Sequence, residues 1–319
     1  MGCGSGVIGF ALLLCSACGS AVVDCGDYEA KLRLLSSPSV LQDAGVTTLA
    51  SRRNEWLIAA TDGQDTRLVS LDKRTRTPTD RGAISPPLAL VGLGARAVLL
   101  TGAALEYIEP DFSTVSLLGP TDGTQGFWIA ENESSLSLIN SGRTAKPTVI
   151  EFAQGKTEPT ILFEGLAGPD SFSAIARNES TTCAIAFDRT SGRDEIRCRG
   201  SGSEFSITPE VAPLSSSNGR RTLAMSPTQV FWIGQTGQIH SAVLKEDGRQ
   251  GVTQVTGRIS SLQSTLCGML VSRTEGDSVL LTYFGNSIFD LVTGLISEPR
   301  LVGNELTYVR DGTAIIHTF

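Results

Sequence analysis

The sequence predicts an all-β protein with the architecture of a β-propeller. Seven short apolar runs recur along the chain, and each lies between turn-forming Gly, Pro, Asn or Asp residues. Runs of four to six apolar residues in such surroundings are typical of strands that are buried on both faces. After residue 26, no segment of eleven or more residues has the apolar spacing that an amphipathic helix needs. The chain is therefore expected to consist of strands and turns.

The spacing of the apolar runs matches that of propeller blades. The runs are Trp56–Ala60, Ala97–Leu100, Phe127–Ala130, Cys183–Phe187, Val230–Gly234, Val279–Phe284 and Leu306–Val309. Their starts lie 27 to 56 residues apart, and the mean of ~42 residues falls in the range of four-stranded blades. The strands of a β-sandwich normally keep one wet face, whereas the middle strands of a blade lie between two neighbouring sheets. We predict seven blades, with six as the alternative.

Composition excludes several classes of protein. The chain has 319 residues, of which 40% are hydrophobic and 18% charged, which suits a folded protein with a substantial core. The net charge of −7 and the scattered basic residues argue against nucleic-acid binding. The tightest basic cluster, Lys73–Arg76, is interpreted as a solvated turn.

The first 17 residues are interpreted as a lipoprotein-type signal peptide. Val7–Leu14 is apolar but too short to span a bilayer as a stable helix. The segment Leu14–Cys18 resembles a bacterial lipobox, in which small residues precede a cysteine that becomes lipidated. The resemblance implies that Cys18 is the lipidated first residue, and Gly19 after it implies outer-membrane sorting. The alternative is plain secretion, with cleavage after Ala21.

The remaining chain divides into a short N-terminal segment and one large domain. Residues 18–45 are expected to form a tether and a possible closing strand, with Tyr28–Leu35 as the candidate strand. Residues 46–319 are expected to form the propeller. The last repeat, Leu306–Phe319, supplies only one hairpin. An N-terminal strand is therefore expected to complete the final blade.

The cysteines outside the signal peptide predict two disulfides. Cys183 and Cys198 flank the turn Arg189–Arg193, and folding a hairpin there places them opposite each other. With Cys18 acylated, Cys25 and Cys267 are the remaining cysteines of the mature chain. The compartment outside the inner membrane is oxidising, so we expect these two to pair as well.

One repeat resembles a known family. Phe231–Gly248 contains an aromatic-Trp pair at Phe231-Trp232, a short turn, Ile239 on the next strand and a Leu-x-x-Asp-Gly tail at Leu244–Gly248. It resembles a blade of YWTD-type propellers and of bacterial β-propeller lipoproteins, and Phe127–Ala130 is a weaker copy. The resemblance implies the propeller fold and a tendency to bind or scaffold, and it carries over no functional residue.

No motif for metal, nucleotide or nucleophile chemistry is present. The acidic turns Asp62–Asp65 and Glu131–Glu133 are interpreted first as hairpin turns, so we predict no metal and no cofactor. The chain has no P-loop and no nucleophile elbow. His240 and His317 are the only histidines, and both are interpreted as structural. The sequence does not exclude a catalytic pair of carboxylates among the 33 acidic residues.

The sequence therefore favours a non-catalytic binding or scaffold propeller anchored to the bacterial cell envelope, over an enzyme. We expect a monomer that binds an envelope or extracellular protein or glycan, and that contacts the membrane only through its lipid. The longer loops Thr75–Pro87 and Thr208–Arg220 are the candidate binding edge. The alternative is an extracellular glycan hydrolase or lyase with a carboxylate pair in the propeller funnel.

Overall fold

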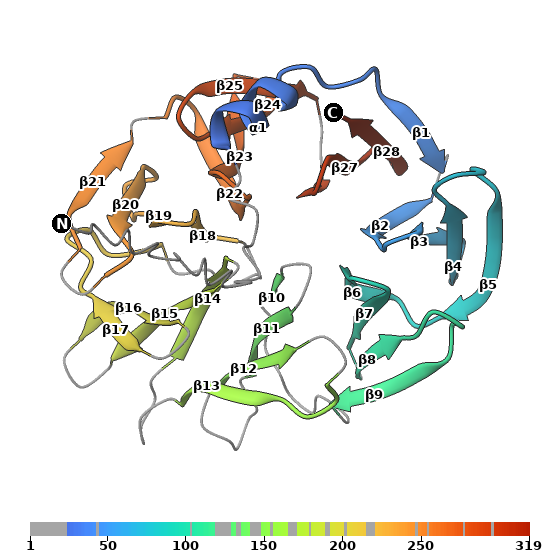
Figure 1. Ribbon diagram of the computed structural model, residues 1–319, viewed down its shortest axis with the longest axis horizontal. Coiled ribbons are helices and arrows are strands. Elements are labelled where there is room, and N and C mark those ends of the chain that lie inside the picture. The colour runs from blue at the N-terminus through green and yellow to red at the C-terminus, as the bar shows by residue number, and fades with distance from the viewer. Residues whose placement is uncertain are drawn as a thin grey trace, which may run out of the picture.

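The computed structural model describes residues 24–319, except for residues 43–44, 103, 119–128, 132–134, 141–147, 154–155, 165–170, 179, 189–191, 201–202, 215–220, 246–247, 254, 277 and 295–296. Its described residues form seven four-stranded antiparallel sheets and one α-helix. Figure 1 shows the sheets arranged around a common centre, with the first strand of each sheet nearest to it. The prediction of an all-β propeller architecture is confirmed.

The sheets are numbered here in chain order. Sheet 1 contains β2 (Val46–Ser51), β3 (Glu55–Asp62), β4 (Asp65–Asp72) and β5 (Pro78–Ile84). Sheet 2 contains β6 (Pro87–Leu93), β7 (Arg96–Thr101), β8 (Leu105–Ile108) and β9 (Thr114–Leu118). Sheet 3 contains β10 (Ile129–Glu131), β11 (Ser135–Asn140), β12 (Thr148–Ala153) and β13 (Thr160–Glu164). Sheet 4 contains β14 (Ser171–Arg177), β15 (Thr182–Asp188), β16 (Arg193–Arg199) and β17 (Glu204–Ile207). Sheet 5 contains β18 (Leu223–Met225), β19 (Gln229–Ile233), β20 (Ile239–Val243) and β21 (Gln250–Thr253). Sheet 6 contains β22 (Arg258–Ser264), β23 (Met269–Glu275), β24 (Ser278–Phe284) and β25 (Ile288–Thr293). Sheet 7 contains β26 (Ser297–Val302), β27 (Glu305–Arg310), β28 (Thr313–Thr318) and, as its outermost strand, β1 (Ser39–Gln42).

The middle strands are apolar on both faces because each sheet is stacked between two neighbours. In β3, Trp56 and Ile58 pack in one cluster with Ile316 of sheet 7. Leu57, between them in the sequence, packs in another cluster with Leu90 of sheet 2. Full burial of such a side chain contributes roughly 1.5–3 kcal/mol. Successive side chains of one strand thus join their sheet to both neighbouring sheets.

The uneven spacing of the apolar runs has a simple structural origin. Five runs lie in the second strand of their sheet, but Phe127–Ala130 overlaps β10, a first strand, and Val279–Phe284 is β24, a third strand. Equivalent second strands start at residues 55, 96, 135, 182, 229, 269 and 305, which are 36 to 47 residues apart. The repeat is therefore more regular than the apolar runs indicate.

The expectation of a strand at Tyr28–Leu35 was wrong, because its first five residues end helix α1 (Cys25–Leu32) and residues 33–35 form the turn and coil that follow. The Asp24 carboxylate accepts hydrogen bonds from the backbone N–H groups of Gly26 and Asp27, which caps the first turn of the helix. The N-terminal strand of sheet 7 is instead β1, which pairs antiparallel with β28.

The expectation that Thr75–Pro87 is a long loop was also wrong. Most of it is β5, the outermost strand of sheet 1. The side chains of β5 are largely exposed, so the segment lacks the apolar pattern that identifies a buried strand. Pro78 is tolerated because it is the first residue of an edge strand.

The turns divide between two faces of the propeller. Since neighbouring strands are antiparallel, turns between first and second strands and between third and fourth strands lie on one face. Turns between second and third strands, and the links from sheet to sheet, lie on the other. Helix α1 packs against the β22–β23 and β24–β25 turns, so we call the first face the α1 face and the second the opposite face.

Candidate functional site

On the α1 face, helix α1 packs where sheets 6 and 7 meet, and we call this region the α1 corner. The Cys25–Cys267 disulfide joins the first residue of the helix to the β22–β23 turn, with 5.4 Å between the two Cα atoms. The pairing predicted from the sequence is confirmed. Cys267 lies in the turn before β23, which begins at Met269.

A buried carboxylate fixes the next turn of the helix. Glu29 is 6% exposed, and it accepts hydrogen bonds from the backbone N–H of Asn286 at 2.6 Å and from Ser287 Oγ at 2.7 Å. Gly285 makes room for it, because a Cβ there would lie 2.4 Å from Glu29 Oε1. Nothing in the sequence distinguishes Glu29 from an exposed acid, because its partners are 254 or more residues away.

A pocket of about 520 Å³ lies beside the helix. Its lining includes Asp24, Asp27, Tyr28, Leu266, Asn304 and Phe319. The rings of Tyr28 and Phe319 meet edge to face with 5.7 Å between their centroids, and Asp27 forms an ion pair with Lys31 at 2.6 Å. The pocket thus combines an aromatic wall with carboxylates that already cap or pair within α1.

The second predicted disulfide lies in sheet 4. Cys183 of β15 and Cys198 of β16 are directly opposite each other in the strand register, with 4.1 Å between their Cα atoms. Both are fully buried. The prediction of a cross-strand bridge is confirmed.

The Lys73–Arg76 cluster is only partly a solvated turn. It connects β4 to β5, and Arg74 and Arg76 are exposed. Lys73, however, donates to Glu305 Oε2 of sheet 7 at 2.9 Å, and the indole N–H of Trp56 donates to the same oxygen at 3.1 Å. The Lys73 side chain therefore links sheet 1 to sheet 7.

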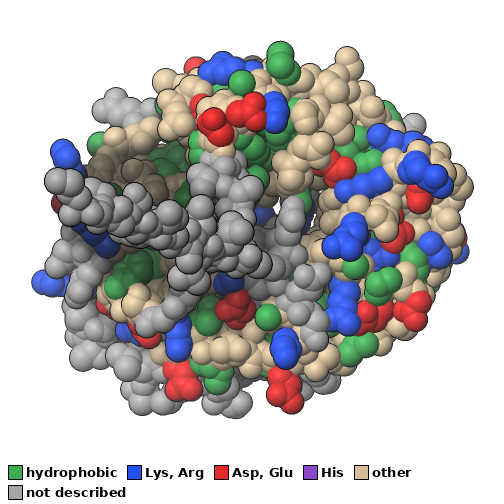
Figure 2. Space-filling model, viewed as in Figure 1, with side chains coloured by type: hydrophobic (Ala, Val, Ile, Leu, Met, Phe, Trp, Pro, Cys, Tyr) green, Lys and Arg blue, Asp and Glu red, His purple; other side chains and the backbone are tan. Residues whose placement is uncertain are grey.

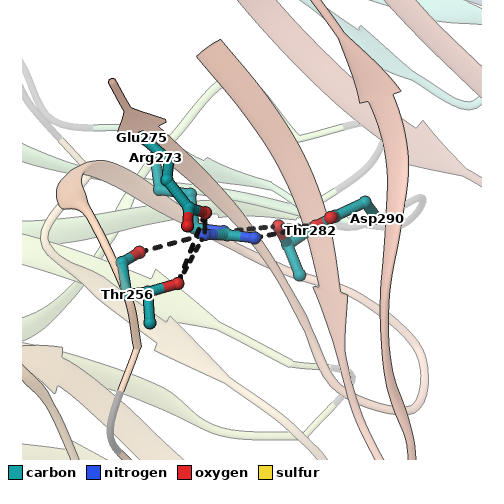
Figure 3. A network of polar contacts seen from close by, with 5 residues as sticks. All are labelled: Thr256, Arg273, Glu275, Thr282 and Asp290. Carbon is teal, nitrogen blue, oxygen red and sulfur yellow. Dashed lines mark hydrogen bonds and ion pairs between the residues drawn. The ribbon is translucent and has the colours of Figure 1, made fainter. Parts of the chain in front are cut away.

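A polar network stabilises sheet 6 near the opposite face (Figure 3). Arg273 is 8% exposed, and its Nη1 donates to both the carbonyl oxygen and Oγ1 of Thr256 at 3.0 Å. The same guanidinium pairs with Glu275, donates to Thr282 Oγ1 at 2.9 Å and reaches Asp290 Oδ1 at 3.1 Å. The network is internal, and it ties the link before β22 to three strands.

The network also holds Asp290 in its charged form. Burial acts to raise the pKa of Asp290, but hydrogen bonds from Thr282 and Arg273 outweigh it. The pKa of Asp290 consequently lies below its ordinary value. The Thr282 hydroxyl donates to Asp290 Oδ1 at 2.6 Å.

Both histidines lie among the packed strands. His317 is 7% exposed; its Nδ1 lies 2.7 Å from the Ser36 carbonyl oxygen and its Nε2 lies 3.0 Å from the Tyr308 hydroxyl. Because a carbonyl oxygen only accepts, Nδ1 carries the proton and Tyr308 donates to Nε2. His240 stacks on Trp232 with 5.6 Å between ring centroids, and burial lowers its pKa.

The two acidic turns differ in how much of them is described. Asp62–Asp65 forms the tight β3–β4 turn, as expected for a hairpin. In Glu131–Glu133 only the first residue lies in the described part of the chain. Across the residues that the structure describes, no group of three or more His, Cys, Asp or Glu side chains could hold a metal ion.

Only residues 208–214 of the candidate loop Thr208–Arg220 belong to the described part of the chain. They lie on the opposite face and are hydrogen-bonded to sheet 5. The indole N–H of Trp232 donates to the Val211 carbonyl at 3.1 Å, and the Leu214 N–H donates to the Ile233 carbonyl at 2.7 Å. Gln250 Nε2 donates to the Thr208 carbonyl at 2.7 Å.

Two predictions of the sequence concern the N-terminal region. Cys18 and the signal segment lie outside the described residues. In the portion that is described, no helix is both long enough and apolar enough to cross a bilayer.

Comparison with known proteins supports the fold. No protein-family model and no curated protein matches the chain. The solved structure of human WBSCR16 aligns with a TM-score of 0.56 and 10% identity over 87% of each chain. The β-propeller domain of the Trilobed protease from Pyrococcus furiosus aligns with a TM-score of 0.58 and 12% identity over 84% of this chain and 91% of that one. PorZ, a surface component of the type-IX secretion system of Porphyromonas gingivalis, gives 0.61 at 7% identity, and the match covers 88% of this chain but only 38% of PorZ. At these identities the likeness shows the fold alone, which is that of a β-propeller.

Proposed function

We propose that the protein is a non-catalytic binding or scaffold propeller, held at the bacterial cell envelope by a lipid on Cys18. The two disulfides, Cys25–Cys267 and Cys183–Cys198, support a location outside the cytosol. Disulfides persist in oxidising compartments outside the cytosol. Residues 1–17 are then the signal peptide, 18–45 the tether with β1, and 46–319 the propeller.

Three of the most strongly engaged charged groups have structural partners, so we assign none of them a catalytic role. Glu29 accepts hydrogen bonds within the α1 corner, Glu305 joins two sheets, and Arg273 ties one sheet together. These strongly engaged groups hold the scaffold, and a carboxylate that serves as a structural acceptor is not free to exchange protons with a substrate.

We also propose that the seven sheets are the complete set of blades of a monomeric ring, and that β1 closes it. The pairing of β1 with β28 supports this, because it joins the N-terminal segment to the last sheet. Closure of this kind brings Cys25 next to Cys267 despite their separation of 242 residues.

Mass spectrometry of the protein extracted from envelopes tests the anchor. We expect a mature chain that begins at Cys18 and carries acyl mass. A mature chain that begins at Val22 without acyl mass would contradict the lipid anchor and favour secretion.

A pulldown from envelope extracts tests the binding role. Since residues 208–214 are hydrogen-bonded to sheet 5, the variant exchanges only residues 215–220 for a Gly-Ser sequence of equal length. The control replaces Gln235 and Thr236, two exposed residues of the β19–β20 turn, by Ser. We expect a component captured by the wild type and by the control to be lost with the exchange.

A screen of the purified protein against bacterial and fungal glycans tests the alternative. We expect no turnover. Hydrolysis or elimination that one Asp or Glu substitution abolishes would overturn the binding role in favour of a glycan hydrolase or lyase.

A further inference from the structure

The chain enters the propeller at the α1 corner. Asp24, where the described chain begins, caps α1 and is six residues after Cys18. The Cys25–Cys267 disulfide fixes the start of the helix to the β22–β23 turn, and the hydrogen bonds of Glu29 fix its middle to the β24–β25 turn. Six residues span at most about 20 Å, even when fully extended.

We propose that the α1 face rests against the surface of a lipid bilayer and that the opposite face points away from it. The inference rests on the lipid anchor proposed above, because an acyl chain on Cys18 then holds the α1 corner within about 20 Å of the membrane. A propeller attached by a flexible tether of many residues would be free to turn over. A short tether that leads into a disulfide-bonded helix restricts this rotation.

Exposed apolar side chains gather at the same corner. Seven large hydrophobic residues are exposed among those that the structure describes, and three of them, Leu34, Leu266 and Ile288, lie at this corner. Leu34 follows α1 and is 77% exposed. Leu266 is beside Cys267 in the β22–β23 turn, and Ile288 follows Ser287, which bonds Glu29. Apolar side chains of this kind enter the interfacial zone of a bilayer.

Basic side chains on this face suit the headgroups of anionic lipids. Arg33 follows α1, and its guanidinium lies 3.9 Å from the centroid of the Phe289 ring, which holds it at the α1 corner. Arg53, in the β2–β3 turn, and Arg74, in the β4–β5 turn, are exposed on the same face. In Figure 1, α1 lies over sheet 6. Figure 2 has the same view, and in it Lys and Arg side chains gather over β2–β5. Asp24 and Asp27 lie nearby, but the first caps α1 and the second pairs with Lys31.

The orientation assigns the two faces different roles. The opposite face carries the Thr208–Leu214 segment, and it is turned toward the aqueous compartment. A soluble partner therefore approaches from that side without competing with the membrane.

Fluorescence quenching by brominated lipids tests the orientation. One variant is Leu34→Trp on the α1 face, and its matched control is Gln64→Trp in the exposed β3–β4 turn of the opposite face. Each acylated variant is reconstituted in vesicles of phosphatidylethanolamine and phosphatidylglycerol, with plain or brominated acyl chains. After subtraction of wild-type emission, we expect bromination to reduce the emission of Leu34→Trp at least two-fold and to leave that of Gln64→Trp unchanged. Lys31→Trp serves as a second α1-face variant if Leu34→Trp does not melt as the wild type does.

Flotation of the vesicles separates the two ways in which the proposal fails. Protein that floats with the vesicles but shows equal quenching of both variants, or quenching of Gln64→Trp alone, overturns the orientation and leaves the anchor standing. Protein that carries no acyl mass and does not float overturns the anchor and the orientation together.

Discussion

Gly92 sets the distance between the innermost strands of sheets 1 and 2. A Cβ on this residue would lie 1.8 Å from the Ser51 carbonyl oxygen, closer than any real contact. Sheets that radiate from a common centre are closest at their inner strands, so a side chain at this position must push two backbones apart. The position requires glycine for lack of space.

Gly92→Ala is therefore expected to lower the free energy of unfolding by about 3 kcal/mol, because the added methyl group overpacks two backbones. Urea unfolding measures the loss. Gly102→Ala is the control, since a Cβ there has no heavy atom within 4 Å. Equal stability of the two variants would contradict the close approach of the inner strands.

Asp290 gives sheet 6 a dependence on pH. Its folded pKa is lowered, so its contribution to stability is present above the ordinary pKa of Asp and is lost as the pH falls through the folded pKa. Nearly half of the side chain is exposed, at 47%, so screening by water limits the contribution to about 0.5–1 kcal/mol.

Asp290→Asn should therefore be less stable than wild type at pH 7, and the difference should disappear as the pH falls below the ordinary Asp range. Thermal melts between pH 3 and pH 7 measure it. A difference that grows toward low pH would contradict the sign of the shift.

Helix α1 and strand β1 attach the N-terminal segment to sheets 6 and 7. The helix buries only Tyr28, Glu29 and Leu32, and it contributes few apolar contacts of its own. Its position depends on the disulfide and on hydrogen bonds to turns more than 250 residues away. Short elements of this kind are stabilised by tertiary contacts and not by helix propensity.

The Cys25→Ser, Cys267→Ser double variant should lose about 3–5 kcal/mol, because the bridge closes a loop with a separation of 242 residues. Each single variant should show the same loss, since one cysteine alone cannot form the bond. Calorimetric melting measures both. The Cys183→Ser, Cys198→Ser variant is the comparison, with an expected loss of about 3 kcal/mol for a separation of 15 residues. A larger loss of stability for the Cys183→Ser, Cys198→Ser variant would contradict the proposed stabilisation of the N-terminal segment by Cys25–Cys267.

For the molecule as a whole, β1 covers the edge of the last sheet. It pairs with β28 through Ser39, Val40 and Gln42, and its Leu41 is 9% exposed. Without β1 the edge of β28 presents unpaired backbone groups, which favours pairing with another chain.

A chain that begins at Gly45 and carries Cys267→Ser should therefore melt lower and aggregate on warming. The control is the full chain with Cys25→Ser and Cys267→Ser, which lacks the same disulfide and retains α1 and β1. Size-exclusion chromatography and melting curves compare the two. Identical melting and a monomeric truncated chain would contradict closure by β1.

Local chemistry in the sequence predicted the strand-rich class, the approximate repeat and both disulfides. Apolar runs between turn residues identify strands buried on both faces, and cysteines that flank a hairpin turn fix their own register. The outermost strands escaped prediction, as β5 shows, because an exposed strand has no burial pattern. Helix α1 escaped because its capping and its buried Glu29 involve too few apolar positions to form a stripe.

Only the tertiary structure decided which groups meet between different sheets. Three contacts join residues from different sheets or from opposite ends of the chain. They are the hydrogen bonds of Glu29 to the β24–β25 turn, the ion pair of Lys73 with Glu305, and the close approach of Gly92 to Ser51. A sequence pattern reports the burial of each strand, because burial depends on the side chains of that strand. The pairing of distant polar groups depends on how the sheets are placed around the centre, and no local pattern carries that information.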